Sequence, residues 1–194
     1  MNRIVLASQN SGKIKEIKSI LSKTELDIHL QSDFGVAEIE ETGLTFIENA
    51  LLKARHACLA TNLPSIADDT GLVVPYLDGK PGLYSARYAG TPKNDKANYE
   101  KLLSELIDVP IENRDAYFYC VIVFMQHAND PAPLICEGRW NGSILFSPQG
   151  KHGFGYDPIF YVPSHHCSAA ELSLEIKNQI SHRGQALNQL VQSF

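Results

Sequence analysis

Ala7-Ser8-Gln9-Asn10-Ser11-Gly12-Lys13 is a polar turn near the start of the chain, and it decides the fold. The run before it, Arg3-Ile4-Val5-Leu6, is short and apolar, which is typical of a buried strand. After it, Ile14, Ile17 and Leu21 recur at helical spacing. The turn therefore joins a strand to a helix, and the chain is predicted to begin as a β-α-β unit.

This turn also has the parts of an anion-binding site. Backbone N–H groups at a helix N-terminus attract negative charge, and Lys13 adds a positive side chain. Because a lysine is unfavourable at the positive end of a helix dipole, we expect a negative ligand to compensate it. The turn is not a P-loop, since Ala7 and Ile14 stand where that motif needs Gly and Ser or Thr. The alternative interpretation is an ordinary strand-to-helix turn.

The composition and charge of the chain exclude several classes of protein. The 194 residues are 44% hydrophobic and 20% charged, which predicts a soluble globular protein with a sizeable core. No apolar run approaches the ~20 residues of a membrane span, and the start of the chain has no signal-peptide pattern. The four widely spaced cysteines are typical of reduced thiols, so we expect a cytoplasmic location. A net charge of −5 argues against a general nucleic-acid binder.

A short strand that begins at Ser65-Ile66-Ala67 is predicted to end in two adjacent carboxylates, Asp68 and Asp69. Ligands bind outside the carboxyl ends of strands in parallel α/β sheets, so these acids are candidates for a site. Strand alternation would send the two side chains to opposite sides, so they cannot have the same role. The alternative is that Asp-Asp-Thr-Gly is only a turn.

Helices and strands are also predicted around these acids. Thr45 and Glu48 have the spacing of a capping box, and the helix after them would carry Lys53. A second helix is expected over 97–107, with Ile107 in its apolar stripe. Strands are expected over 116–125 and 134–145, and this antiparallel excursion predicts a mixed sheet.

The last third of the chain contains a second informative stretch, Gly150–Phe160. Its glycines permit close backbone approach to a flat ligand, Phe154 and Tyr156 offer stacking faces, and Asp157 offers an acceptor. The alternative is a glycine-rich turn whose aromatic rings fill the core.

Basic side chains are predicted to gather at a break between two helices further on. A capping box at Ser168–Glu171 predicts a helix running towards Lys177, and Ser181 is a plausible cap for a last helix that begins with His182 and Arg183. The alternative is that these cationic side chains only interact favourably with the negative end of a helix dipole. The run His165-His166-Cys167 suggests zinc, but three adjacent ligands do not easily surround one ion.

An ordered set of motifs resembles the inosine/xanthosine triphosphate pyrophosphatase family over nearly the whole chain. The set is listed here in chain order: Ser8–Lys13 with Glu16, Glu41–Gly43, Glu48–Ala50 with Lys53, Ala67–Leu72, Ser85–Tyr88, Gly153–Pro158 and Ser181–Arg183. Two departures are small: Ile176 stands where the family often has Glu, and Thr70 where Ser is common.

The resemblance implies an α/β fold with an elongated mixed β-sheet flanked by helices, in two lobes with a central cleft. The whole chain, residues 1–194, would form a single nucleoside triphosphate pyrophosphatase domain. The resemblance also implies a homodimer and magnesium-dependent hydrolysis of ITP, dITP, XTP and dXTP to monophosphate and pyrophosphate, which keeps deaminated purines out of DNA and RNA.

It also implies roles for residues. Glu41 and Asp69 would hold Mg²⁺, because this ion prefers oxygen ligands. Asp69 would activate the attacking water with support from Asp68, and Lys13 and Lys53 would neutralise phosphate charge. The substrate-binding residues would be Ser8, Gln9, Asn10, Ser11, Gly12, Lys13, Thr70, Phe154, Gly155, Tyr156, Asp157, Lys177, His182 and Arg183.

Two other functions fit the sequence less well. A Maf-type nucleotide pyrophosphatase would have Ser-Pro-Arg-Arg at the first turn, where this chain has Asn10-Ser11-Gly12-Lys13. A non-catalytic nucleotide-binding module would have lost the acids, whereas Glu41, Asp68 and Asp69 are all present.

Overall fold

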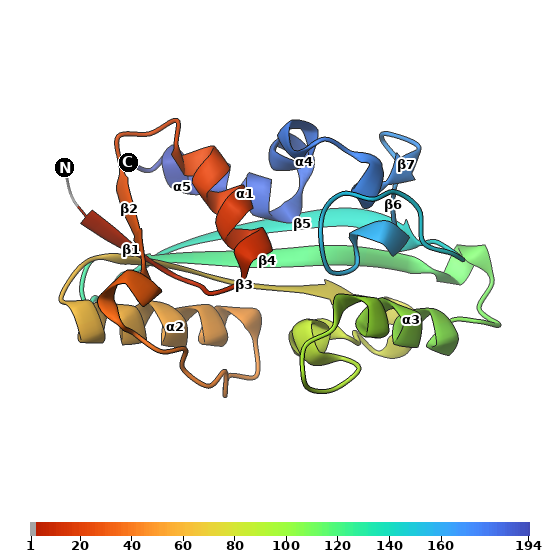
Figure 1. Cartoon of the computed structure of the whole chain (residues 1–194), viewed down its shortest axis with the longest axis horizontal. Helices are drawn as coiled ribbons and strands as arrows, with labels where there is room; N and C mark the ends of the chain where they lie inside the picture. Colours follow the sequence, from red (N-terminus) through yellow and green to blue (C-terminus); the bar gives the residue numbers. More distant parts are fainter. Residues whose placement is uncertain (1–2) are drawn as a thin grey trace. The chain divides into compact units, whose positions relative to one another are not determined.

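A computed structural model describes residues 3–194 of the chain (Figure 1). Seven strands form a mixed sheet in the order β2-β1-β3-β4-β5-β6-β7, and five α-helices flank it in the described residues. The strands are β1 (Arg3–Ala7), β2 (Asp27–Leu30), β3 (Ser65–Val73), β4 (Asp115–Met125), β5 (Leu134–Ile144), β6 (Phe160–Val162) and β7 (Cys167–Ser168). The α-helices are α1 (Ser11–Leu21), α2 (Phe46–Thr61), α3 (Asp95–Glu105), α4 (Leu174–Ile180) and α5 (His182–Val191). The predicted mixed sheet with flanking helices is confirmed.

The chain divides into two compact units. The first unit comprises Met1–Asp69, Cys120–Gly138 and His182–Phe194, and the second comprises Thr70–Tyr119 and Arg139–Ser181. Each unit has its own apolar core. The first core contains Ile4, Leu6, Ile17, Ile66, Ile122 and Leu187, and the second contains Leu72, Phe118, Trp140, Phe160 and Leu172.

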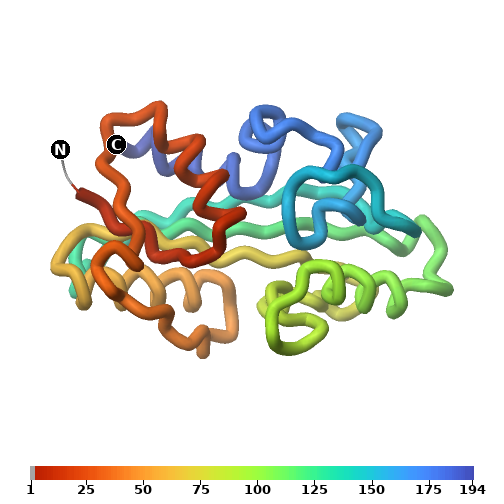
Figure 2. The backbone as a smooth tube through the Cα atoms, in the orientation of Figure 1, coloured from red at the N-terminus to blue at the C-terminus, as the bar shows by residue number. Residues whose placement is uncertain are grey.

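In the first unit, the parallel pairing of β1 with β2 and β3 confirms the β-α-β beginning. Helices α1 and α5 lie on one face of the sheet, and α2 lies on the other (Figure 1). The tube in Figure 2 shows α1 beside α5, although they come from opposite ends of the chain. Ala7, the last residue of β1, pairs with Ala67 of β3. Asp68 and Asp69, the next residues of β3, therefore lie just beyond the C-terminal end of β1.

In the second unit, β6 pairs antiparallel with the end of β5, and β7 pairs antiparallel with β6. Helix α3 covers one face of this part of the sheet and α4 lies on the other (Figure 1). Ile107, expected in the apolar stripe, is instead 74% exposed. Helix α3 ends at Glu105 and Leu106 is its C-cap, so the helical periodicity does not extend to Ile107.

Two further expectations about elements were wrong. Asp68 and Asp69 do not end a short strand but lie inside β3, which continues to Val73 with both acids buried. The capping box at Ser168 exists, but it opens only a single 3₁₀ turn, Ala169–Glu171. Helix α4 begins separately after Ser173, whose side chain accepts the Ile176 N–H. Within residues 3–194, every helix is too short or too polar to span a bilayer.

Candidate functional site

The turn between β1 and α1 is held by its own polar side chains. The Asn10 side-chain oxygen accepts the N–H groups of Gly12 at 3.0 Å and Lys13 at 3.3 Å, and Ser8 Oγ accepts the Asn10 N–H. Asn10 is therefore the N-cap of α1, as its residue type favours. Two of the N–H groups expected to be open to an anion are thus already bonded. Gln9 and Ser11 lie in the same turn with exposed side chains.

Lys13 lies beside Asp68, at 2.9 Å from Nζ to Oδ2. This carboxylate supplies the negative partner that we had expected a ligand to provide at the helix N-terminus. Burial alone would raise the pKa of Asp68, but Lys13, Arg183 and Lys53 outweigh it and hold that pKa well below its ordinary value. Asp68 is therefore a buried anion at neutral pH.

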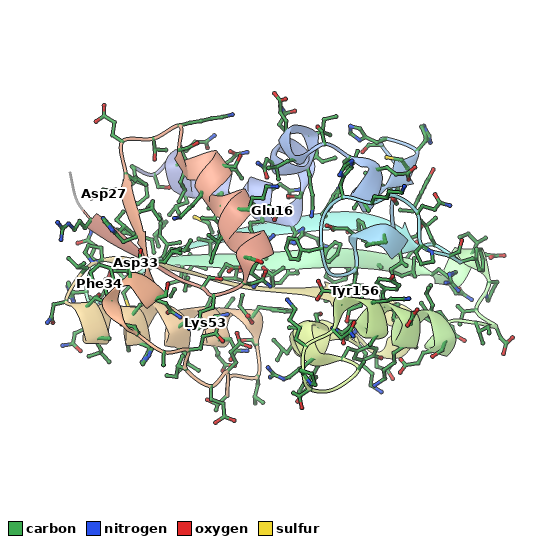
Figure 3. The ribbon with its side chains drawn as sticks, in the orientation of Figure 1. Glu16, Asp27, Asp33, Phe34, Lys53 and Tyr156 are labelled. Carbon is green, nitrogen blue, oxygen red and sulfur yellow. The ribbon has the colours of Figure 1, made fainter. Side chains whose placement is uncertain are left out.

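Arg183 connects the start of α5 to both α1 and β3. Its guanidinium forms an ion pair with Glu16 of α1 and lies 3.5 Å from Asp68 Oδ2. Burial would lower the pKa of Arg183, but Glu16 and Asp68 outweigh it and raise it. Glu16, labelled in Figure 3, was not among the predicted site residues, although it follows Lys13 at the i+3 spacing of helical neighbours.

Asp69 points to the opposite side of β3, towards α2, as strand alternation requires. There Lys53, labelled in Figure 3, has its Nζ 2.9 Å from Asp69 Oδ1 and 2.6 Å from Glu41 Oε1. Lys53 is placed by the helix that Thr45 caps, as predicted. Burial raises the pKa of Asp69, and the nearby Glu41 adds to this, while Lys53 and Lys13 oppose it. For Lys53, burial lowers the pKa, but the three acids around it outweigh that effect and raise it.

Glu41 and Asp69 fit a hard divalent cation by the chemistry of their donors. Each places one carboxylate oxygen within 3 Å of the same cationic nitrogen, so the two oxygens already converge on one positive charge. Mg²⁺ typically takes one or two carboxylates and completes its shell with water and phosphate oxygens. Among residues 3–194, no three His, Cys, Asp or Glu side chains form a ready-made metal cluster. His165 and His166 contact Ser164 and Tyr161 instead.

The predicted base-binding residues of the second unit are also linked. Lys177 Nζ lies 2.5 Å from Asp157 Oδ2 and 4.9 Å from the centre of the Phe154 ring. The same Asp157 oxygen accepts the Phe154 N–H, and the Gly155 N–H is donated to Asp95. Gly153 has φ +75°, and a Cβ there would lie 2.1 Å from Asp157 Oδ2. A glycine is therefore required for this loop to close around Asp157.

The packing of Tyr156 agrees with the alternative in which an aromatic ring of this stretch fills the core. Tyr156 is 4% exposed, belongs to the core of the second unit, and donates its hydroxyl to the Ser85 carbonyl. This burial favours a packing role, and its predicted contact with a base stays a prediction. Phe154 is only partly buried, so its ring is the more accessible of the two.

The predicted site residues are thus divided between the two units. Ser8–Lys13, Glu41, Lys53, Asp68, Asp69, His182 and Arg183 belong to the first unit, and Thr70, Phe154–Asp157 and Lys177 belong to the second. His182 is buried, at 3% exposed. Lys177 and Arg183 each have their own carboxylate partners, so their expected gathering at one base edge stays a prediction.

Known proteins match the chain over its whole length. A family model described as the Ham1 family matches residues 4–193. The chain is 57% identical over 190 residues to the dITP/XTP pyrophosphatase of Xylella fastidiosa (strain 9a5c), which covers 98% of this chain and 96% of that protein. It is 56% identical over 194 residues to the dITP/XTP pyrophosphatase of Escherichia coli (strain K12), covering 100% of this chain and 98% of that protein. A solved HAM1 protein from Coxiella burnetii has a TM-score of 0.92 at 53% identity, covering 100% of this chain and 98% of that one.

Proposed function

Because the chain belongs to the Ham1 family, we infer that it hydrolyses deaminated purine nucleoside triphosphates, dITP and XTP among them. The products are the nucleoside monophosphate and pyrophosphate. The structural observation that carries this inference is the convergence of Glu41 and Asp69 on the Lys53 ammonium. The two carboxylates are suited to ligate a cation, and the lysine is suited to bind the phosphate oxygens of a polyanionic substrate.

Glu41 and Asp69 are the residues that would hold Mg²⁺. When bound, the ion would neutralise phosphate charge as it develops on the leaving pyrophosphate. The support for this assignment is the donor set described above, with Asp69 Oδ1 and Glu41 Oε1 near one positive charge.

The reaction needs a base, and Asp69 is our candidate. Water attacks the α-phosphorus, its proton passes to the Asp69 carboxylate, and the bond from that phosphorus to the bridging oxygen breaks, so that pyrophosphate leaves with the bonding pair. Burial of Asp69 raises its pKa, and a more basic carboxylate is a better proton acceptor. Lys13 and Lys53 would stabilise the charge that moves onto the leaving group. Asp68 supports the reaction by holding Lys13, its partner at 2.9 Å.

A different group of residues would recognise the purine base. We propose that Phe154 stacks on the purine and that Lys177, with His182 and Arg183, favours a 6-keto oxygen. Adenine presents a donor at that position, so buried donors would lose their partner and adenine would be rejected. The cation of Lys177 beside the Phe154 ring supports this assignment for these two residues.

The biological setting is proposed on the same basis. We propose a cytoplasmic homodimer that removes deaminated nucleotides before they enter DNA or RNA, with neither nucleic acid nor membrane as a partner. The net charge of −5 supports the absence of a nucleic-acid partner.

A substrate panel tests this function. The protein is incubated with Mg²⁺ and, separately, with dITP, ITP, XTP, GTP, ATP and dUTP, and both pyrophosphate and orthophosphate are measured. We expect pyrophosphate from dITP, ITP and XTP, and little product from ATP or dUTP. Release of orthophosphate, or a preference for dUTP or ATP, would contradict the proposed function.

A further inference from the structure

Lys53 occupies the position between the two carboxylates assigned to the metal. Its Nζ lies 2.6 Å from Glu41 Oε1 and 2.9 Å from Asp69 Oδ1, and its side chain is only 15% exposed. An ammonium ion so placed partly neutralises both acids. The Lys53 ammonium therefore serves as a counter-cation for both carboxylates.

We propose that Lys53 keeps free divalent cations out of the Glu41–Asp69 site, so that the metal enters together with the nucleotide triphosphate. The proposal rests on the proposed function, since it takes these acids as the metal ligands. A free Mg²⁺ would meet carboxylates already neutralised and would have to approach a positive charge at the same place. Because like charges at short separation repel, the Lys53 ammonium opposes the entry of a divalent cation between the two carboxylates.

The triphosphate would change this balance by offering Lys53 other partners. Phosphate oxygens are strong acceptors for an ammonium group, and the side chain of a lysine is flexible. Once Lys53 turns to the phosphate, Glu41 and Asp69 lose this ammonium partner and are able to ligate a cation. Lys53 is thus a residue that sets the order of binding, in addition to any contact with substrate.

The test measures the metal alone, without nucleotide. Free Mn²⁺ is counted by electron paramagnetic resonance as it is titrated into wild type, Lys53→Met, Lys53→Arg and Lys13→Met. Lys13 is the matched control, because its side chain is also 15% exposed and pairs with Asp68, which is not an assigned ligand. We expect Lys53→Met to bind Mn²⁺ at least about tenfold more tightly than the other three proteins. Thermal unfolding with and without Mn²⁺ checks that each variant folds, and a rise in Tm with Mn²⁺ is expected for Lys53→Met alone.

Three results would overturn the proposal. The first is wild type binding free Mn²⁺ as tightly as Lys53→Met, and the second is an equal gain in Lys13→Met. The third is a Lys53→Met/Glu41→Gln protein that keeps the tight binding, since the ion would then lie elsewhere. Failure of the proposed function would show separately, as wild type that releases no pyrophosphate from dITP, while the Mn²⁺ titration still decides the role of Lys53.

Discussion

At the scale of single residues, the first unit depends on two neighbouring aspartates that face opposite sides of β3. Asp68 faces α1 and α5, where Lys13 and Arg183 surround it, and Asp69 faces α2 and Lys53. Their environments separate their pKa values. Nearby cations lower the pKa of Asp68, whereas burial raises the pKa of Asp69. Two carboxylates with separated pKa values are suited to different roles.

Asp69→Asn tests the catalytic role directly. The amide cannot accept the proton of the attacking water, so we expect turnover of dITP to fall by about 10²–10⁴-fold. Binding of dITP, measured by equilibrium dialysis, should remain because the lysines are unchanged. Turnover close to that of wild type would remove Asp69 from the role of base.

Asp68→Asn is expected to act on stability. Asp68 is 1% exposed, and removing its charge leaves Lys13 and Arg183 with less compensation, at a cost of about 3–5 kcal/mol for a broken buried pair. Urea unfolding at neutral pH measures the loss. Asp108→Asn removes an exposed carboxylate and should change stability by less than about 0.5 kcal/mol.

The pH dependence of this effect has a definite sign. Because the folded pKa of Asp68 is depressed, its contribution is complete above the unfolded value, near 3.9, and is lost as the pH falls through the folded pKa. The difference between wild type and Asp68→Asn should therefore be constant from about pH 5 upward and shrink below about pH 4. A difference that grows on acidification would contradict the ion pairing of Asp68.

Much of this residue-level arrangement could be predicted from the sequence. Alternation along a strand predicted that Asp68 and Asp69 lie on opposite sides. A negative ligand was expected beside Lys13, and the structure has Asp68 there. Glu16 could not be assigned a partner, because its contact with Arg183 joins residues that are 167 positions apart. Such pairing depends on the packing of α1 against α5, which local sequence patterns do not contain.

At the scale of elements, the Gly150–Phe160 stretch begins as a loop, which backbone conformation and two carboxylates hold in place, and it ends at the first residue of β6. Gly150, Gly153 and Gly155 all have positive φ. Asp157 and Asp95 accept the N–H groups of Phe154 and Gly155, which fixes the loop on both sides of the Phe154 ring. A Cβ at Gly150 would meet Ala170 and one at Gly153 would meet Asp157, so close approach within the protein requires these two glycines. Their close approach to a flat ligand stays a prediction.

Two glycine substitutions distinguish the effect of a steric clash with Asp157 from the effect of backbone strain at positive φ. Gly153→Ala and Gly155→Ala both put a Cβ at positive φ, which costs about 1–2 kcal/mol. Only at Gly153 would the Cβ meet Asp157 Oδ2, at 2.1 Å, while the space at Gly155 is open. We therefore expect Gly153→Ala to raise KM for dITP more than Gly155→Ala does. Equal KM values for the two variants would show that the contact with Asp157 does not position this loop for substrate.

Element boundaries were harder to predict than element types. β3 was expected to be a short strand that ends in the two aspartates, and the alternative was a turn over Asp-Asp-Thr-Gly. The strand continues because its acids find buried cationic partners, Lys13 and Lys53, from two helices. Likewise, the helix expected from Ser168 stops after one turn, and Ser173 caps a new one. Tertiary partners therefore override local propensity in β3, whereas the start of α4 is set by a second local cap, Ser173.

At the scale of the whole molecule, seven strands carry two compact units with separate apolar cores. The acids and lysines assigned to the triphosphate and the metal all lie in the first unit, around β3 and the helices α1 and α2. Phe154 and Lys177, assigned to the base, lie in the second. The proposed bond cleavage takes place at the acids and lysines of the first unit.

The central claim, attack of water on the α-phosphorus, is tested most directly by hydrolysing dITP in water enriched in ¹⁸O with Mg²⁺ present. The label is located by mass spectrometry of the isolated products. The account predicts one ¹⁸O atom in the nucleoside monophosphate and none in the pyrophosphate. Label in the pyrophosphate would mean attack at the β-phosphorus and would contradict the account.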